Sequence, residues 1–291
     1  MVLKSTFLLA CLLLLPGFVS AQVDVSKAGQ PPQYLQIIAG RMSSRLDRAA
    51  GRGRHQASSW TDGSIEVGPD QFYLGTSAVA GPSEMLWLVF HKNLRDFEKQ
   101  ARVDATTLGS MGQRDSEQSA ELVSNNRMML ARRRDDLSYR PIFNFGEYRY
   151  IAVHTFHSKL AHTRDVMEVL KILNSAREKS GAEVHIVVYE VMSGDTEGTL
   201  VSIVPRESLA EMEQGDQRMQ QAVGEDGWRR IRELADAGGF TLDNTLFAFE
   251  PANSNLSPEM VAANPDFWNT RSKVGKRITP RSPSNVKSQN P

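Results

Sequence analysis

FYLGTSAVAGPSEMLWLVF (residues 72–90) and IVVYEVMSGDTEGTLVSIV (residues 186–204) have the same organisation. Each stretch is an apolar run, a short turn with glycine, a hydroxyl residue and glutamate (GPSE or GDTE), and a second apolar run. Runs rich in β-branched and aromatic residues on either side of a glycine turn are typical of β-hairpins. An acidic helical pattern follows each hairpin, from Leu94 and from Leu209. We therefore expect an internal duplication.

The elements around these hairpins predict one order twice. The first half gives strands at 34–40, 72–79, 85–90 and 138–145, a weak helix at 43–60, and helices from Leu94 and at 116–134. The second half gives strands at 148–157, 183–191, 199–205 and 245–251, a helix at 159–181 closed by Gly181, and a broken helix at 208–238. FNF at 143–145 then matches FAF at 247–249. Both halves show the β, α, β, β, α, β order of a ferredoxin-like unit.

The strand at 183–191 is apolar on both of its faces. Val187, Tyr189 and Val191 alternate with Ile186, Val188 and Met192. A ferredoxin-like sheet with helices on one side leaves its other face in water, so a second apolar face needs a cover. The equivalent sheet of the other half provides the simplest cover. We expect an α+β fold of two tandem ferredoxin-like repeats that pack within one chain as a dimeric α/β barrel, with helices outside.

The N-terminal 21 residues have the regions of a signal peptide. Lys4 precedes an apolar run of about ten residues, and small residues end the segment at Ala21. A membrane anchor is the rival interpretation, but a spanning helix needs roughly twenty apolar residues. The sequence therefore predicts an exported protein, in the periplasm or outside the cell, that starts at Gln22 and has no membrane association after cleavage.

The remaining boundaries follow from composition. Residues 22–32 end in two prolines and are expected to be a flexible leader. The two repeats are placed at 33–145 and 146–251. The polar, Ser/Pro/Asn-rich segment 252–291 is expected to be mostly disordered, with NPDFW as its one apolar element.

Composition excludes several kinds of function. Cys11 is the only cysteine and lies in the predicted signal peptide, which excludes thiol catalysis, cysteine-bound zinc and iron–sulfur clusters. The 34 basic and 34 acidic residues cancel, so no net charge attracts nucleic acid. No metal site is predicted, because the histidines form no recognised ligand spacing. Homo-oligomerisation stays open.

Three segments carry a resemblance to a known family: the hairpin FYLGTSAVAGPSEMLWL, the junction RRDDLSYRP and the closing SPEMVAANPDFW. With the tandem order, they make nearly the whole mature chain resemble a family of uncharacterised secreted bacterial proteins. The resemblance implies the dimeric α/β-barrel fold shared with the NIPSNAP and EthD-like groups, and it implies no particular reaction. That wider superfamily includes cofactor-free monooxygenases, haem-degrading enzymes, chlorite dismutase-like proteins and binding proteins.

The candidate ligand-binding residues are in the second half. Tyr150, His154 and Phe156 share one face of the strand at 148–157, and His185 and Tyr189 lie on or beside a neighbouring strand. An aromatic-lined cavity with a histidine suits a small aromatic ligand, and such a histidine can act as general base. The competing interpretation is that these side chains fill the barrel core. The sequence identifies no catalytic residue.

Two motifs receive structural interpretations. GPSE and GDTE have one glycine before the acidic residue and precede no helix N-terminus, so we interpret them as hairpin turns and not as anion sites. The run 132–134 of three arginines is interpreted as the C-terminus of the helix at 116–134.

The function hypotheses are therefore two. The first is binding of a small apolar or aromatic ligand in an α/β-barrel cavity, without a cofactor. The alternative is an oxygenase-type enzyme, cofactor-free or haem-dependent, that uses His154 or His185; a single axial histidine for haem leaves no spacing signature.

Overall fold

The computed structural model describes residues 29–42, 72–79, 84–99, 101 and 123–269. Eight strands form a closed barrel in the order β1-β3-β2-β8-β5-β7-β6-β4, and all neighbours pair antiparallel. The strands are β1 (Tyr34–Met42), β2 (Phe72–Ala78), β3 (Glu84–His91), β4 (Val123–Arg133), β5 (Tyr150–Ser158), β6 (Val187–Ser193), β7 (Leu200–Arg206) and β8 (Phe240–Phe249). The helices are η2 (Leu160–His162), α4 (Thr163–Ser180), α5 (Leu209–Asp236), η3 (Pro251–Asn253), α6 (Pro258–Ala263) and α7 (Pro265–Trp268), and residues 94–99 are also helical.

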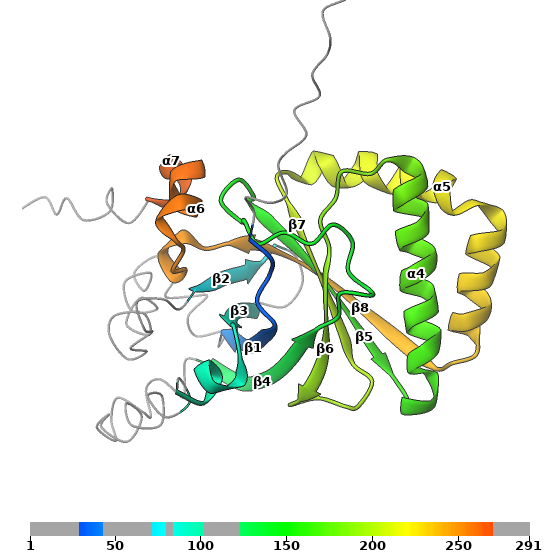
Figure 1. Ribbon diagram of the computed structural model, residues 1–291, viewed down its shortest axis with the longest axis horizontal. Helices are drawn as coiled ribbons and strands as arrows, with labels where there is room; N and C mark the ends of the chain where they lie inside the picture. Colours follow the sequence, from blue (N-terminus) through cyan, green and yellow to red (C-terminus); the bar gives the residue numbers. More distant parts are fainter. Residues whose placement is uncertain (1–28, 43–71, 80–83, 100, 102–122, 270–291) are drawn as a thin grey trace, which may run out of the picture.

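The strands of the first half, β1 to β4, and those of the second half, β5 to β8, form two sides of the barrel (Figure 1). The first half contributes neighbouring strands in the order β4-β1-β3-β2, and the second contributes β8-β5-β7-β6. The barrel closes through β2 with β8 and through β4 with β6, so each closure joins the last strand of one order to the first strand of the other. The predicted barrel within one chain is confirmed.

Two apolar layers hold the second half. Val187, Tyr189 and Val191 belong to the cluster that fills the barrel, together with Leu35, Leu88 and Ile203. Ile186 and Val188 belong to a second cluster outside the barrel, with Leu170 of α4 and Val204 of β7. The two-faced apolarity of β6 is therefore explained as expected: the other half covers one face, and helices cover the other.

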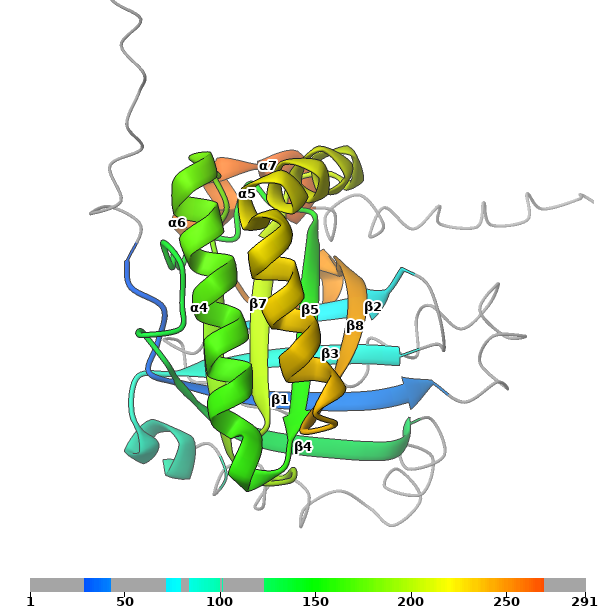
Figure 2. The same cartoon turned by 90° about the vertical axis from the view of Figure 1, so that its right-hand side faces the viewer.

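Helices α4 and α5 lie side by side on the outer face of the second-half strands (Figure 2). Gly181 ends α4 in the left-handed conformation at φ 63°, as its position after the periodic run predicts. Gly224, at φ 68° and ψ 173°, breaks α5 into two parts, which agrees with the predicted broken helix. None of the described helices has both the length and the apolarity to cross a membrane.

The expected helix at 116–134 is wrong over residues 123–133, which form strand β4. Met, Leu, Ala and Arg favour helices, but β4 pairs with β1 along its length and with β6 at its end. Met129 and Ala131 alternate into the barrel interior. The barrel needs this strand to close, so tertiary pairing overrides local propensity. The arginine run accordingly ends a strand and not a helix.

The expected strand at 138–145 is also wrong. Residues 141–145 have no regular structure, and Tyr139 makes only an isolated bridge with Ile186. β4 is the strand equivalent to β8, so the match of FNF with FAF does not hold. Phe143 and Phe145 instead pack at the end of the barrel, where Phe143 lies 4.7 Å from Phe72 between ring centroids.

The segment 252–291 was expected to be mostly disordered, but residues 252–269 are ordered in the structure. These residues fold into η3, α6 and α7 against the same end of the barrel. The indole of Trp268 donates to the Gly146 carbonyl at 2.7 Å, and its ring lies 5.8 Å from that of Phe249. We call this the aromatic end of the barrel. The predicted signal peptide, most of the leader, the helix at 43–60 and residues 270–291 lie outside the described residues.

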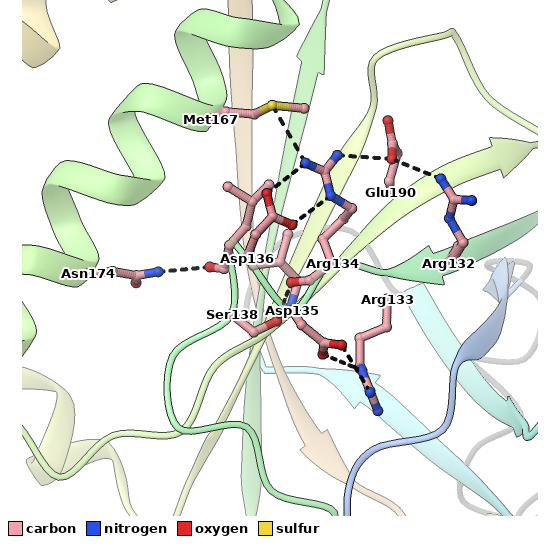
Figure 3. Close-up of polar contacts among 11 residues, drawn as sticks. Arg132, Arg133, Arg134, Asp135, Asp136, Ser138, Met167, Asn174 and Glu190 are labelled. Atoms are coloured by element: carbon pink, nitrogen blue, oxygen red, sulfur yellow. Dashed lines mark hydrogen bonds and ion pairs between the residues drawn. The ribbon is translucent and has the colours of Figure 1, made fainter.

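A cluster of polar side chains joins the two halves where the chain leaves β4 (Figure 3). We call Arg134, Asp136 and Glu190 the polar latch. The Arg134 guanidinium donates two hydrogen bonds to Asp136, both at 2.9 Å, and a third to Glu190 of β6 at 3.0 Å. The Ser138 hydroxyl accepts from the Val188 amide at 3.0 Å. The chain between the halves is thus fixed to the second half by side-chain bonds as well as by packing.

Candidate functional site

The structure separates the five predicted ligand-binding residues. Tyr150, His154 and Phe156 point to the outer face of β5, since Ile151 and Val153 between them fill the barrel. Phe156 is buried in the layer under α4. His154 donates from Nδ1 to the Asn244 side-chain oxygen of β8, 2.5 Å away.

Tyr189 and His185 lie elsewhere. Tyr189 is fully buried inside the barrel, and its hydroxyl donates to the Pro32 carbonyl at 3.3 Å. His185 precedes β6, and its Nδ1 lies 2.7 Å from the Arg140 carbonyl oxygen. The five side chains therefore do not line one cavity. Ligand binding by any of them stays a prediction.

Haem does not fit the layer between α4 and the sheet. Val166 of α4, Val188 and Leu200 have no exposed surface there and pack in one cluster. His162, at the start of α4, pairs with Asp165 at 2.8 Å, and its ring packs directly on Gly239. A macrocycle would have to displace this apolar layer.

The end of the barrel opposite the aromatic end carries a charged cluster of Arg127, His157, Asp195 and Asp243. His157 is the last inward residue of β5, and Asp243 lies on β8 diagonally across from it. Asp195 is in the turn between β6 and β7, and Arg127 is on the inward face of β4. At this end of the barrel, the apolar side chains of the interior therefore give way to these four polar side chains. We call this the charged end.

His157 lies between two carboxylates. Its Nε2 is 3.2 Å from Asp243 Oδ2, and its Nδ1 is 3.5 Å from Asp195 Oδ2. The Asp195 side chain is only 7% exposed, whereas that of Asp243 is 75% exposed. Asp195 also forms an ion pair with Arg127. The imidazole therefore makes its hydrogen bond with the exposed Asp243, and its Nδ1 faces the buried Asp195 carboxylate at ion-pair distance.

This arrangement can move a proton. A histidine with a fixed carboxylate at one nitrogen keeps its orientation and tautomer, and its second nitrogen can exchange a proton with a ligand. The Asp243 side chain is exposed, so a ligand can reach Nε2 from solvent and take its position there. The Arg127 side chain is 46% exposed and offers a guanidinium to an acidic group of that ligand.

Sequence reasoning placed His157 on the opposite face from His154, and the structure agrees. It missed Asp195, because GDTE was interpreted as a turn and nothing more. The sequence did offer one signal, which is the aspartate directly after Gly194 in the second turn. In the structure, the φ of 93° at Gly194 and its close contact with Met128 fix the backbone that carries this aspartate. Arg127 could not be found, since its segment was assigned to a helix.

A surface pocket of about 860 Å³ lies at the break in α5. It is lined by Gln220, Gln221, Gly224, Glu225, Trp228, Arg229 and Arg232. The Trp228 indole donates to the Gln220 carbonyl at 3.1 Å across the break. The walls come from one helix and are mostly exposed, which makes the pocket a weaker candidate than the charged end.

No protein-family model and no curated protein sequence matches this chain. Among solved structures, it is similar to an anthrone oxidase-like protein, with a TM-score of 0.50 and 11% identity over 75% of this chain and 91% of that one. It is also similar to a mutant chlorite dismutase from Candidatus Nitrospira defluvii, with a TM-score of 0.50 and 12% identity over 82% and 98% of the two chains. At such identity the likeness shows the fold alone, which is that of the dimeric α/β-barrel proteins.

Proposed function

We propose that the protein binds a small molecule at the charged end of its barrel, with His157 as the group that exchanges a proton with it. The observation that carries this proposal is the placement of His157 between buried Asp195 and exposed Asp243. β-Barrels hold small ligands preferentially at their mouths, and the interior of this barrel is filled by its own side chains.

The ligand expected here is an apolar or aromatic body with one acidic group. Arg127 and His157 supply a cation and a hydrogen-bonding nitrogen for the acidic group. The apolar layer just inside, which includes Met129 and Val153, favours an apolar body. This sharpens the ligand class expected from the sequence and moves the site from the outer face of β5 to the barrel end.

Ligand screening on paired variants tests the position of the site. Aromatic carboxylates and phenols are screened by ligand-observed NMR against the wild type, His157→Asn and His154→Asn. We expect His157→Asn to abolish binding and His154→Asn to keep it, because the two rings lie on opposite faces of β5. Loss in His154→Asn with binding retained in His157→Asn would place the site on the outer face instead.

The second candidate is an oxygenase-type enzyme, and the His157–Asp195 pair favours its cofactor-free form. Removal of a proton from an activated phenol or enol is the step that such a pair can perform. An anthrone oxidase-like protein and a chlorite dismutase share the fold. Oxygen consumption with a bound phenol that disappears in His157→Asn supports this candidate. A Soret band that appears on haem titration would instead favour the haem-dependent form.

Export and duplication complete the proposal. The signal-peptide-like start supports export to the periplasm or beyond, and the equivalent strand orders of the two halves support tandem ferredoxin-like repeats of the NIPSNAP-like kind. Mass spectrometry of the full-length chain expressed in a Gram-negative host should find a product that begins at Gln22. A cytoplasmic product that begins at Met1 contradicts export.

A further inference from the structure

Two arginines extend the apolar layer under α4 toward the aromatic end of the barrel. Arg177 lies two helical turns after Leu170, so it is on the same sheet-facing side of α4. Arg206 lies two residues after Val204, so it is on the same outer face of β7. Leu170 and Val204 pack in one cluster, which brings the two guanidinium groups to the same end of that layer.

Among the described residues, Arg177 forms no ion pair with a carboxylate, and Arg206 forms one that leaves its Nε without a partner. Arg177 donates from Nη1 to the Asn174 side-chain oxygen at 2.6 Å, and no carboxylate in the described ranges forms an ion pair with it. The Arg206 side chain is 17% exposed and reaches Glu211 only at 3.4 Å. Its Nε is buried and has no hydrogen-bond partner among the described residues.

The glutamates near the two arginines have other hydrogen-bond partners as well. Glu178, next to Arg177, accepts from the Tyr139 hydroxyl at 3.0 Å and pairs with Arg140. Glu211 also accepts from the Glu207 amide. Burial and the charge of Arg206 lower the pKa of Arg177 to about 10, which agrees with two cations at close range. Burial, and after it the nearby glutamates, raises the pKa of the Tyr148 hydroxyl to about 12. This hydroxyl therefore stays protonated at neutral pH and can donate a hydrogen bond.

We infer that Arg177 and Arg206 form a binding site for a small oxyanion, a phosphate or carboxylate group, between the C-terminal end of α4 and the end of β7. An oxyanion accepts from the unpartnered Arg206 Nε and from Arg177, which forms no ion pair with a described carboxylate. The α5 N-terminus, capped by Ser208, adds the favourable end of a helix dipole nearby. The site lies at the opposite end of the barrel from His157 and does not depend on the function proposed there.

Titration with inorganic phosphate tests the site. Calorimetry and thermal melts compare phosphate with sodium chloride at equal ionic strength for the wild type, Arg177→Met, Arg206→Lys and Arg232→Met. Arg232 is exposed on α5 and serves as the matched control. We expect phosphate to raise the Tm of the wild type and of Arg232→Met, and Arg177→Met to weaken phosphate binding about tenfold or more.

The same series separates anion binding from a structural role. Methionine keeps the aliphatic stem of Arg177 and removes an uncompensated charge, so without phosphate this variant should melt at or above the wild-type temperature. Arg206→Lys keeps a charge and loses the Nε donor, so weaker phosphate binding in a folded protein is expected. An acetate titration run in parallel assigns the site to carboxylates if acetate also binds, and to phosphates if it does not. Equal melting in phosphate and chloride, or an undiminished response in Arg177→Met, would overturn the inference.

Discussion

Replacement of Arg134 by methionine should loosen the connection between the halves of the barrel. The substitution keeps most of the aliphatic stem and removes the guanidinium, which donates to Asp136 and Glu190 (Figure 3). The Glu190 carboxylate keeps a weaker contact with Arg132 at 3.7 Å. The variant therefore loses three charge-assisted hydrogen bonds without creating a fully isolated charge.

The size of the effect follows from exposure. The Arg134 side chain is 20% exposed, that of Asp136 54% and that of Glu190 27%. The half-exposed pair with Asp136 contributes about 0.5–1 kcal/mol. The more buried bond to Glu190 contributes about 1–1.5 kcal/mol. We expect the free energy of unfolding to fall by about 2 kcal/mol, which lowers the Tm by about 4–8 °C in a chain of this size.

Urea unfolding at several pH values measures this loss and its origin. The hydrogen bonds from Arg134 hold the pKa of Asp136 below its ordinary value of 3.8. A carboxyl group whose pKa is lower in the folded state stabilises the protein above its unfolded value, and that stabilisation disappears as the pH falls through the folded value. The difference between wild type and Arg134→Met should therefore be full at pH 7 and shrink below about pH 4.

Arg229→Met provides the control, since Arg229 and Asp226 form a pair in which both side chains are well exposed, at 63% and 88%. Its free energy of unfolding should stay within about 0.5 kcal/mol of the wild type. If Arg134→Met is as stable as this control, the latch contributes nothing and the reasoning from burial is refuted.

Three further substitutions probe other parts of the fold. Gly75→Ala should cost at least about 2 kcal/mol in urea unfolding, because a Cβ there would overlap the Asn253 carbonyl oxygen and lie 2.7 Å from the Asn253 Cβ. Gly29→Ala is the control and should cost little, because a Cβ at Gly29 meets nothing within 4 Å. Equal stabilities of the two variants would contradict this. Tyr189→Phe should cost about 1 kcal/mol by guanidinium unfolding, since it removes the hydrogen bond from the buried hydroxyl to the Pro32 carbonyl. An unchanged midpoint would argue against that bond. His91→Gln tests a buried histidine beside Gln36 and Phe97, whose pKa burial lowers despite the nearby Asp96. Because the unfolded chain binds this proton more readily, His91 should cost the wild type stability as the pH falls below about 6.5, and the variant should lose less between pH 7 and pH 5; parallel losses would show that His91 is not the cause.

The elements of the second half could be predicted from sequence because their signals are local. The helix at α4 has a strong apolar period and a glycine at its C-terminus, and both strands of the second hairpin are β-branched. The first half was less predictable, since residues 123–133 have the composition of a helix and become a strand only through pairing with β1 and β6. That error also displaced the fourth strand onto 138–145.

The candidate sites depend on residues that are distant in sequence. Asp195 and His157 meet only because the β6–β7 turn lies at the same end of the barrel as the end of β5. Arg177 and Arg206 come together because a helix and a strand pack through one apolar layer. No local spacing links either pair, so neither could be derived before the strand order was known.

The sequence by itself determined that this protein has two similar hairpins, a capped helix, a broken helix and strands with two apolar faces, because propensity, periodicity and turn residues act over a few neighbours. Tertiary structure decided that β4 is a strand, that residues 252–269 close the aromatic end, and which charged side chains meet. These outcomes depend on how eight strands must pair to leave no open edge, and that condition applies to the whole barrel and not to any single segment.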